Sequence, residues 1–439
     1  MKHTIHTFTG LLGITLCIFW CGQVSAGVDQ LITEKELRYR QLDFQYLCKG
    51  NKTYSEQLHK KLVSDNSKGY IYQITMSSRQ DPKKLNEIRT KFAYDMDEFI
   101  MNPRNLNNNK AFREAYAGEL IKHFKIALKR YPMDRDRVIN VNLALMLPTL
   151  GKIGDPRVGQ YLSELLRTGE NDIIKLFAMK GLQKQIAKDI PKVRPFMENK
   201  ERMEIAERMA PLLKYLTNPP DYLKKGTPAQ IGGYQYIRCE AIEALGETQL
   251  SCVPLLPGLD GEIHAPVAYW LAKTLAAEKD RISPPPSIEE QIEAAIGLCK
   301  MDAQLIPRYN SQLGFYLVGN FLADYTKEFR EDQARFDRAQ TKTLPNGKEV
   351  SVRVPPRISW KLQSARLLVA LEELEKNTPP NNKLQQNYAS ILQSARTLLT
   401  SIKSGNQVES EAVLRGHVKA IRPANGLVYE KSQIKIELP

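Results

Sequence analysis

The sequence predicts a mainly α-helical protein, because three of its properties are typical of packed helices. Apolar residues recur at three- and four-residue steps over most of the 439-residue chain. Clusters of proline and glycine separate these stretches, as they do at helix ends. Hydrophobic residues make up 42% and charged residues 26% of the chain. This composition argues against global disorder and against a protein with many membrane spans.

The first 26 residues have the pattern of a secretory signal peptide. Lys2 is followed by an apolar run from Leu11 to Trp20, and Val24-Ser25-Ala26 supplies the small residues that a signal peptidase reads. The run is about half of the ~20 residues that a spanning helix needs, so a membrane anchor is the weaker interpretation. A lipoprotein signal at Cys21 is disfavoured, because Trp20 stands where a small residue is expected. We therefore predict cleavage after Ala26 and export to a periplasmic, cell-envelope or extracellular location.

The mature chain is expected to begin with an N-terminal helical region, residues 27–134. Helical periodicity is clearest at 111–130, where Phe112, Tyr116 and Leu120 belong to one apolar face. Helices are also expected at 29–47 and 83–100. These flanking helices, together with one at 305–340, are interpreted as caps of a central array.

Helical stretches continue through the rest of the chain. They are expected at 138–150, 158–167, 172–187, 200–216, 236–247, 265–277, 288–300, 312–338, 358–376 and 383–403. Breaks that contain proline or glycine fall at 151–156, 218–220, 284–286 and 378–380. Asp155 before Pro156 is typical of an N-cap followed by a first-turn proline, so a helix should restart there.

Residues 135–300 resemble short HEAT-like helical repeats of about thirty residues. Leu147–Val158 is similar to the helix end and turn of such a repeat, and Leu176–Gly181 has the shape of the next helix end. Ile237–Gly246 matches the second-helix pattern, and Val267–Ala276 occupies the corresponding place one repeat later. The resemblance implies an irregular α-solenoid that binds proteins, with small residues where helices approach closely.

An irregular helical bundle is the alternative to the solenoid. Residues 218–233 interrupt the register as an extra loop, in which Gly232-Gly233 is interpreted as a turn. The periodicity would then reflect core-facing helix sides and no true repeat.

Two segments depart from the helical pattern. Within the C-terminal helices, residues 301–404, a hairpin is predicted near 342–354, because Asn346-Gly347 precedes alternating valines. Residues 405–439 are predicted to be a β-rich tail that contains a short hairpin. This tail alternates at Val418, Ile421, Val428, Ile434, Ile436 and Leu438. A lone hairpin is marginally stable in water, so docking on the last helices is expected.

Cleavage would leave four cysteines in the mature chain, Cys48, Cys239, Cys252 and Cys299. In an oxidising compartment an even number favours disulfides. Cys239 and Cys252 are the best candidates for a pair, because they flank a predicted helix and turn. The alternative is that the cysteines are small buried residues in helical packing.

The sequence contains no recognisable catalytic, cofactor-binding or metal-binding motif. His-Glu-x-x-His and Gly-x-Ser-x-Gly strings are both missing, and the histidines are scattered. Glu119 and His123 are four residues apart, and a structural pair on one helix face is the simpler interpretation. We therefore predict no catalytic residue, no metal and no cofactor.

The basic residues supply the only positional signal for binding. Lys and Arg number 63 against 49 Asp and Glu, which gives a net charge of +14. Lys122, Lys125 and Lys129 share one helix face next to Arg130, and Lys180, Lys184 and Lys188 recur at four-residue steps on another. These faces are candidates for a basic strip that attracts an anionic partner. Ordinary solvated helix faces are the alternative.

Three hypotheses about function follow. The first is an exported, non-enzymatic scaffold that binds a protein partner through a helical-repeat surface. The second is a cell-envelope protein that binds an anionic polymer or a lipid surface through the Lys-rich faces. The third is an enzyme whose site is assembled from distant residues. Export and the lack of a nucleic-acid-binding motif argue against nucleic acid as the partner.

Overall fold

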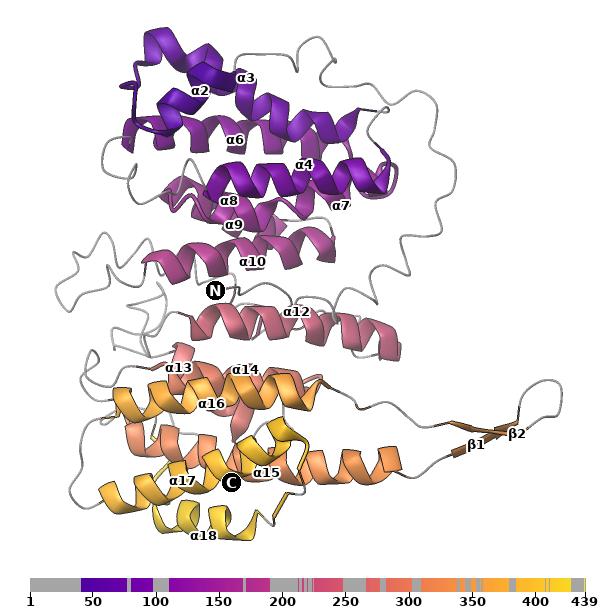
Figure 1. Cartoon of the computed structure of the whole chain (residues 1–439), viewed down its shortest axis with the longest axis vertical. Coiled ribbons are helices and arrows are strands. Elements are labelled where there is room, and N and C mark those ends of the chain that lie inside the picture. The colour runs from indigo at the N-terminus through magenta and orange to yellow at the C-terminus, as the bar shows by residue number, and fades with distance from the viewer. Residues whose placement is uncertain are drawn as a thin grey trace.

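The computed structural model confirms a mainly α-helical protein (Figure 1). It describes residues 41–76, 80–97, 110–168, 171–189, 225–247, 266–276, 282–301, 309–337, 340–343, 349–352, 358–378 and 384–427 except 407 and 410, with positions 212, 215, 216, 219, 223, 356 and 438. The predicted signal peptide lies outside the described residues. None of the described helices is long and apolar enough to cross a membrane.

The N-terminal helices form the first part of the core. They are α2 (Gln41–Cys48), α3 (Glu56–Tyr72), η2 (Gln73–Thr75), α4 (Pro82–Asp95) and α6 (Lys110–Arg130). The expected helix at 111–130 therefore agrees with α6 to within one residue. Helix α6 packs along α3 and buries Phe112, Tyr116 and Leu120. These are the residues of the apolar face that the sequence predicts.

The central helices occupy the region with the repeat-like pattern. They are α7 (Arg137–Ala144), α8 (Leu147–Gly151), α9 (Pro156–Thr168), α10 (Asp172–Asp189), α12 (Pro228–Gly246), α13 (Pro266–Leu275) and α14 (Ile288–Cys299). The predicted cap of α9 is confirmed, because the Asp155 carboxylate accepts a hydrogen bond of 2.9 Å from the backbone N–H of Arg157.

The C-terminal part contains four helices and one hairpin. The helices are α15 (Ser311–Asp337), α16 (Trp360–Asn377), α17 (Gln385–Ser404) and α18 (Ala412–Ala420). Strands β1 (Gln340–Thr343) and β2 (Glu349–Val352) pair antiparallel between α15 and α16, with Lys342 opposite Val350. The hairpin therefore lies where the sequence predicts it, and Figure 1 shows it projecting away from the helices.

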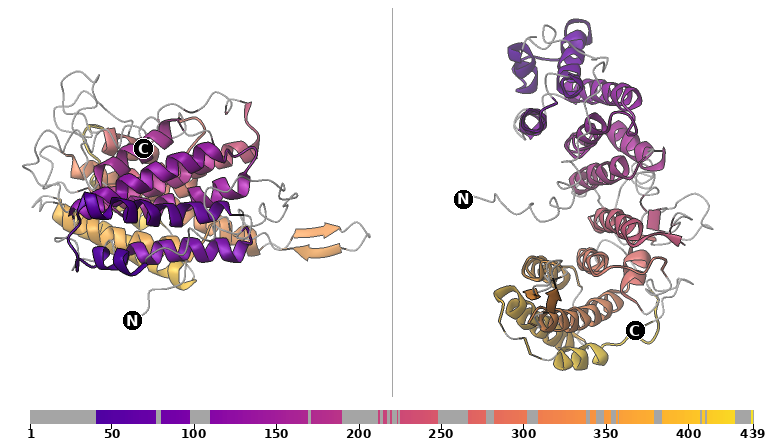
Figure 2. Two further views of the ribbon diagram at one scale, coloured as in Figure 1. Left: turned by 90° about the horizontal axis from the view of Figure 1, so that it is seen from above. Right: turned by 90° about the vertical axis from the view of Figure 1, so that its right-hand side faces the viewer.

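The helices follow one another in a curved row. Helix α10 packs on α8 and α12, α12 packs on α14, and α16 packs on α14 and α17. In the right-hand view of Figure 2 many of the helices are seen nearly end-on, and the row runs from the indigo N-terminal helices to the yellow C-terminal ones. Helices α9 and α13 pack against α10 and α14 from the side of this row. Residues far apart in the sequence therefore share a surface on adjacent helices.

Two pairs of glycines set the closest approaches in this row. A Cβ atom on Gly151 of α8 would lie 2.1 Å from the carbonyl oxygen of Gly181 on α10. A Cβ atom on Gly246 of α12 would lie 2.8 Å from the Cα atom of Gly297 on α14. The glycines quoted for the repeat pattern thus stand at close helix contacts. The helix that meets Gly246 is α14.

The expected β-rich tail is wrong for residues 412–420, which form helix α18. Leu414, Val418 and Ile421 are all buried. Their spacing of four and three residues is that of a helix face. The prediction of a strand used Val418 and Ile421 without Leu414. The remaining residues of that expected hairpin, 428–437, lie outside the described part of the chain.

The expected turn at Gly232-Gly233 is also wrong, because both glycines lie inside α12. The helix begins earlier with a capping box, in which the Thr227 hydroxyl and the Gln230 side chain each bond the other residue's backbone N–H. Both glycines are exposed, and a Cβ atom on either would meet no atom within 4 Å. A strong start signal therefore outweighs the helix-weakening effect of two glycines, about 1 kcal/mol each.

The two kinds of glycine in α12 predict opposite effects of the same substitution. We expect Gly246→Ala to lower the free energy of unfolding by about 1–3 kcal/mol, because the added methyl overlaps α14. Gly233→Ala should raise it by about 1 kcal/mol, since alanine favours the helix and has free space. Urea unfolding followed by circular dichroism measures both. Equal effects of the two variants would contradict the described contact.

Candidate functional site

The first predicted group of cations lies exposed on α6, and part of its charge is neutralised. Lys122 pairs with Glu119 at 3.0 Å, and Lys125 pairs with Glu164 of α9 at 3.0 Å. Lys129 and Arg130 end the helix and are exposed, and Lys129 makes no ion pair with a described residue.

The second predicted group lies on α10. Lys180 is only 30% exposed and pairs with Glu240 of α12 at 2.7 Å. Lys184 is exposed and makes no ion pair with a described residue. The side chain of Lys188 lies outside the described residues. The structure therefore brings Lys180 into an interhelical pair, whereas Lys184 remains available to a partner.

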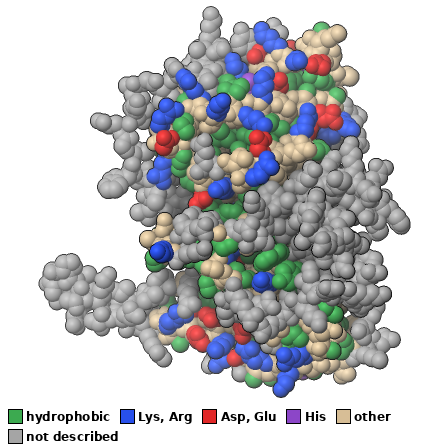
Figure 3. All heavy atoms as spheres, turned by 180° about the vertical axis from the view of Figure 1, so that it is seen from behind, with side chains coloured by type: hydrophobic (Ala, Val, Ile, Leu, Met, Phe, Trp, Pro, Cys, Tyr) green, Lys and Arg blue, Asp and Glu red, His purple; other side chains and the backbone are tan. Residues whose placement is uncertain are grey.

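Charge is distributed unevenly along the row of helices. The described helices from α2 to α10 contain 20 Lys and Arg against 10 Asp and Glu. Those from α12 to α16 contain 8 against 13. Figure 3 shows the face opposite to that of Figure 1. Lys and Arg side chains are scattered over the upper, N-terminal half of this face, with fewer acidic side chains among them. The basic excess thus belongs mainly to the N-terminal helices.

An open pocket of about 590 Å³ lies between α3 and α6. Its lining is polar and consists of Glu56, Gln57, Lys60, Lys61, Ser64, Asp65, Glu119 and Lys122. Ser64 donates a hydrogen bond of 2.6 Å to Glu119 and lies 3.2 Å from Nε2 of His123. The other ring nitrogen of His123, Nδ1, lies 2.9 Å from the Tyr72 hydroxyl.

Ser64, His123 and Glu119 are the residue types of a hydrolase triad, but their arrangement differs from that of a triad. In a catalytic triad the acid orients the histidine through the nitrogen that faces away from the serine. Here Glu119 and Ser64 both lie next to Nε2, and Tyr72 lies next to Nδ1. The backbone N–H groups around Ser64 are inside α3, where they bond to the helix. The cluster therefore joins α3 to α6, and it confirms that Glu119 and His123 share one helix face.

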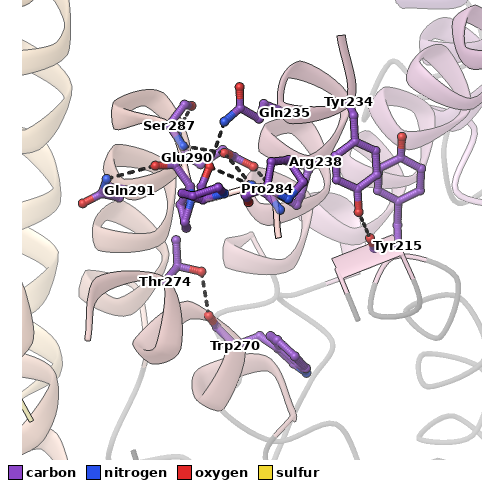
Figure 4. A network of polar contacts seen from close by, with 12 residues as sticks. Tyr215, Tyr234, Gln235, Arg238, Trp270, Thr274, Pro284, Ser287, Glu290 and Gln291 are labelled. Atoms are coloured by element: carbon purple, nitrogen blue, oxygen red, sulfur yellow. Dashed lines mark hydrogen bonds and ion pairs between the residues drawn. The ribbon is translucent and has the colours of Figure 1, made fainter. Parts of the chain in front are cut away.

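A buried ion pair fixes α12 against the start of α14 (Figure 4). The Arg238 guanidinium is 2% exposed and donates to both carboxylate oxygens of Glu290, which is fully buried. It also donates a 2.8 Å hydrogen bond to the carbonyl oxygen of Pro284. Glu290 in turn accepts from the backbone N–H of Ser287 at 2.6 Å, which caps α14.

On its other side Arg238 lies over an aromatic ring. Its guanidinium carbon is 5.3 Å from the ring centre of Tyr234, which stacks on Tyr215. The Nη1 atom is buried and has no hydrogen-bond partner among the described residues. Burying a donor without a partner costs free energy, and the cation–π contact with Tyr234 offsets part of this cost.

A second set of charges lies where α12, α14 and α16 meet. Arg366 of α16 forms a two-pronged pair with Glu293 of α14, with Nη2 at 2.7 Å from Oε2. The same Nη2 atom is 3.9 Å from Glu243 of α12. Arg366 thus pairs closely with Glu293 and only at longer distance with Glu243. We call this region the α12–α16 corner, made of Tyr236, Glu240, Glu243, Glu293, Leu362, Arg366 and Val369.

The corner has a surplus of negative charge. Burial raises the pKa of Glu293, and Glu243 and Glu240 raise it further although Arg366 opposes them. Burial and Glu243 likewise raise the pKa of Glu240 against the effect of Lys180. Four carboxylates, Glu240, Glu243, Glu290 and Glu293, therefore share three cations, Lys180, Arg238 and Arg366.

Apolar side chains surround these charges at the surface. Tyr236 is 43%, Leu362 is 38% and Val369 is 61% exposed. Leu362, Arg366 and Val369 are spaced by four and three residues, so they lie on one face of α16. Tyr236, Glu240 and Glu243 have the same spacing on α12. Exposed aromatic and aliphatic groups around an arginine are typical of protein-binding surfaces.

The described cysteines carry free thiols. Cys48 and Cys299 are buried, and Cys239 is half-buried at the α12–α16 corner. Burial, followed by the charges of Glu293, Glu290, Glu240 and Glu243, raises the pKa of the Cys239 thiol well above its usual value. Cys252 lies outside the described residues, so its pairing with Cys239 stays a prediction. A thiol with so high a pKa is a poor nucleophile.

Sequence reasoning missed the α12–α16 corner. The stripes on α12 and α16 are readable from their spacing, but Arg366 stands 123 positions after Glu243. Nothing in a single sequence joins the two. The described residues contain no group of three or more His, Cys, Asp or Glu side chains arranged to hold a metal ion.

Comparison with known proteins returned no matching protein-family model, no matching curated protein and no matching solved structure.

The Arg238–Glu290 pair predicts a large effect of removing one partner. We expect Arg238→Met to lower the free energy of unfolding by about 3–5 kcal/mol, because Glu290 keeps a buried, unpaired charge. Arg238→Met combined with Glu290→Gln should recover part of this loss, since glutamine is neutral. Arg396→Met, which breaks the exposed pair with Glu375, should cost at most about 1 kcal/mol. Urea unfolding of the variants tests this order, and a loss no larger than that of Arg396→Met would contradict it.

His123 predicts a loss of stability in mild acid. Burial lowers its pKa, Glu119 opposes this effect, and Lys122 and Lys68 add to it. The unfolded chain therefore takes up a proton near pH 6.5 more readily than the folded protein does. Stability from the neutral imidazole is present above that pH and is lost as the pH falls through the lower, folded-state pKa. His123→Gln should weaken the decrease in unfolding free energy between pH 7.5 and 5.5, measured by urea unfolding at each pH, and an unchanged decrease would contradict this prediction.

Proposed function

We propose that this protein is an exported, non-enzymatic scaffold that binds a protein partner through the surface of its helical row. One observation carries the proposal. Lys180–Glu240 joins α10 to α12 and Arg366–Glu243 joins α12 to α16, and the same faces of α12 and α16 carry the exposed side chains Tyr236, Leu362 and Val369. Exposed apolar side chains grouped in this way are typical of interaction sites.

The curved row of helices supports the finer part of the proposal, an irregular HEAT-like α-solenoid. The glycine contacts at Gly151–Gly181 and Gly246–Gly297 recur between successive helices of the row, as expected of a repeated helix interface. Such arrays offer extended surfaces for protein binding. The signal-peptide pattern at residues 1–26 supports export with cleavage after Ala26.

A second candidate function is binding to an anionic polymer or lipid surface. The excess of Lys and Arg on helices α2–α10 favours it, as do Lys129 and Lys184, which are exposed and form no ion pair with the residues that the structure describes. It is the weaker candidate, because Lys122, Lys125 and Lys180 are each paired with a glutamate.

Site-specific cross-linking tests the proposed surface. A photoreactive phenylalanine at position 236 or 369 should capture the same protein in the exported fraction of the source cells. The same group at Val413, which is 64% exposed on α18, should capture nothing specific. The mature form of this protein in that fraction should begin at Gly27. No capture from 236 and 369, together with salt-sensitive sedimentation on vesicles with 30% phosphatidylglycerol, would contradict the proposal and favour the second candidate.

A further inference from the structure

We propose that the α12–α16 corner binds a basic amphipathic helix of a protein partner. This inference rests on the proposed function and names the kind of segment that occupies the surface.

Charge is the first step. The corner and the ion pairs beside it hold four carboxylates against three cations, and Glu243 is the carboxylate with the longest ion pair. Among the described residues, one cation lies within 4 Å of Glu243: Arg366, at 3.9 Å, which also pairs with Glu293. Glu243 is 31% exposed, so a partner's ammonium or guanidinium group can reach it. The surrounding helices α12 to α16 are acidic as a group, so the field favours a basic segment and repels an acidic one.

Apolar spacing is the second step. Leu362 and Val369 are seven residues apart on α16, which is about two helical turns or ~10 Å. Apolar side chains at positions i, i+4 and i+7 of a partner helix repeat over the same distance. Tyr236 on α12 provides a third contact on the other side of the charged centre. A helix that carries apolar residues on one side and Lys or Arg beside them therefore matches both walls of the corner.

The backbone is the third step. The corner is built from the sides of α12, α14 and α16, whose amides and carbonyls are bonded within each helix. In Figure 1, α16 crosses in front of α14 and lies below α12, and no strand of the described part of the chain packs beside them. An extended peptide would find no free strand edge here, whereas a helix, whose own backbone is satisfied, needs only side-chain contacts.

Two synthetic helical peptides test the proposal with the full-length mature chain. Both are 18 residues long with leucine at i, i+4, i+7 and i+11; one carries lysine beside the leucines and the other carries glutamate there. Fluorescence anisotropy should show at least tenfold tighter binding of the lysine peptide. Its affinity should fall as NaCl rises from 50 to 300 mM.

Matched variants locate the binding. Val369→Asp and Glu243→Lys should each weaken binding of the lysine peptide at least tenfold. Val413→Asp and Glu87→Lys, at exposed positions of α18 and α4, should leave it unchanged. Circular dichroism checks that all four variants fold.

Three results would overturn the inference. The first is equal binding of the two peptides, or no binding of either. The second is equal loss from Val369→Asp and Val413→Asp. The third is a change in the sedimented mass of the protein alone on Val369→Asp, which would show that a second copy covers the corner. If cross-linking at 236 and 369 still captures a protein in any of the first two cases, the proposed function stands and only the basic-helix inference fails.

Discussion

The buried pair between Arg238 and Glu290 is the interaction on which the centre of the molecule depends. A guanidinium and a carboxylate that leave water are tolerated only when they satisfy each other. Arg238 can do so only if α12 lies against the first turn of α14, where Glu290 also caps the helix. The pair thus fixes the position of α12 along α14. That position in turn brings Glu243 and Glu293 within reach of Arg366 on α16.

The net charge of the whole chain gives a misleading impression of its surface. A value of +14 suggests a basic protein that seeks anions. The helices divide this charge, with a basic N-terminal group and an acidic group from α12 to α16, and the exposed apolar side chains of the α12–α16 corner lie in the acidic part. Charge at a binding surface depends on which side chains the packing brings together, and the sum over a chain does not contain that information.

Local signals in the sequence predicted most of the helices but little of the candidate site. The apolar face at Phe112–Leu120 and the Asp155 cap involve residues close in sequence, and both agree with the structure. The tail at 412–420 was misassigned because a short apolar pattern fits a strand and a helix almost equally well. The α12–α16 corner joins side chains from three separate helices. Single-sequence periodicity shows which side of a helix is apolar, but it does not show which helix will cover it.

The glycine contacts described for α8–α10 and α12–α14 have a mechanical consequence. Where two backbones touch, the helices have no flexible side chains between them that could rearrange, so each of these pairs should move as one stiff block. Among the described residues no such glycine contact joins α10 to α12, where the Lys180–Glu240 pair spans the interface. Bending of the row would therefore concentrate at this joint, where α10 and α12 pack through side chains that can rearrange.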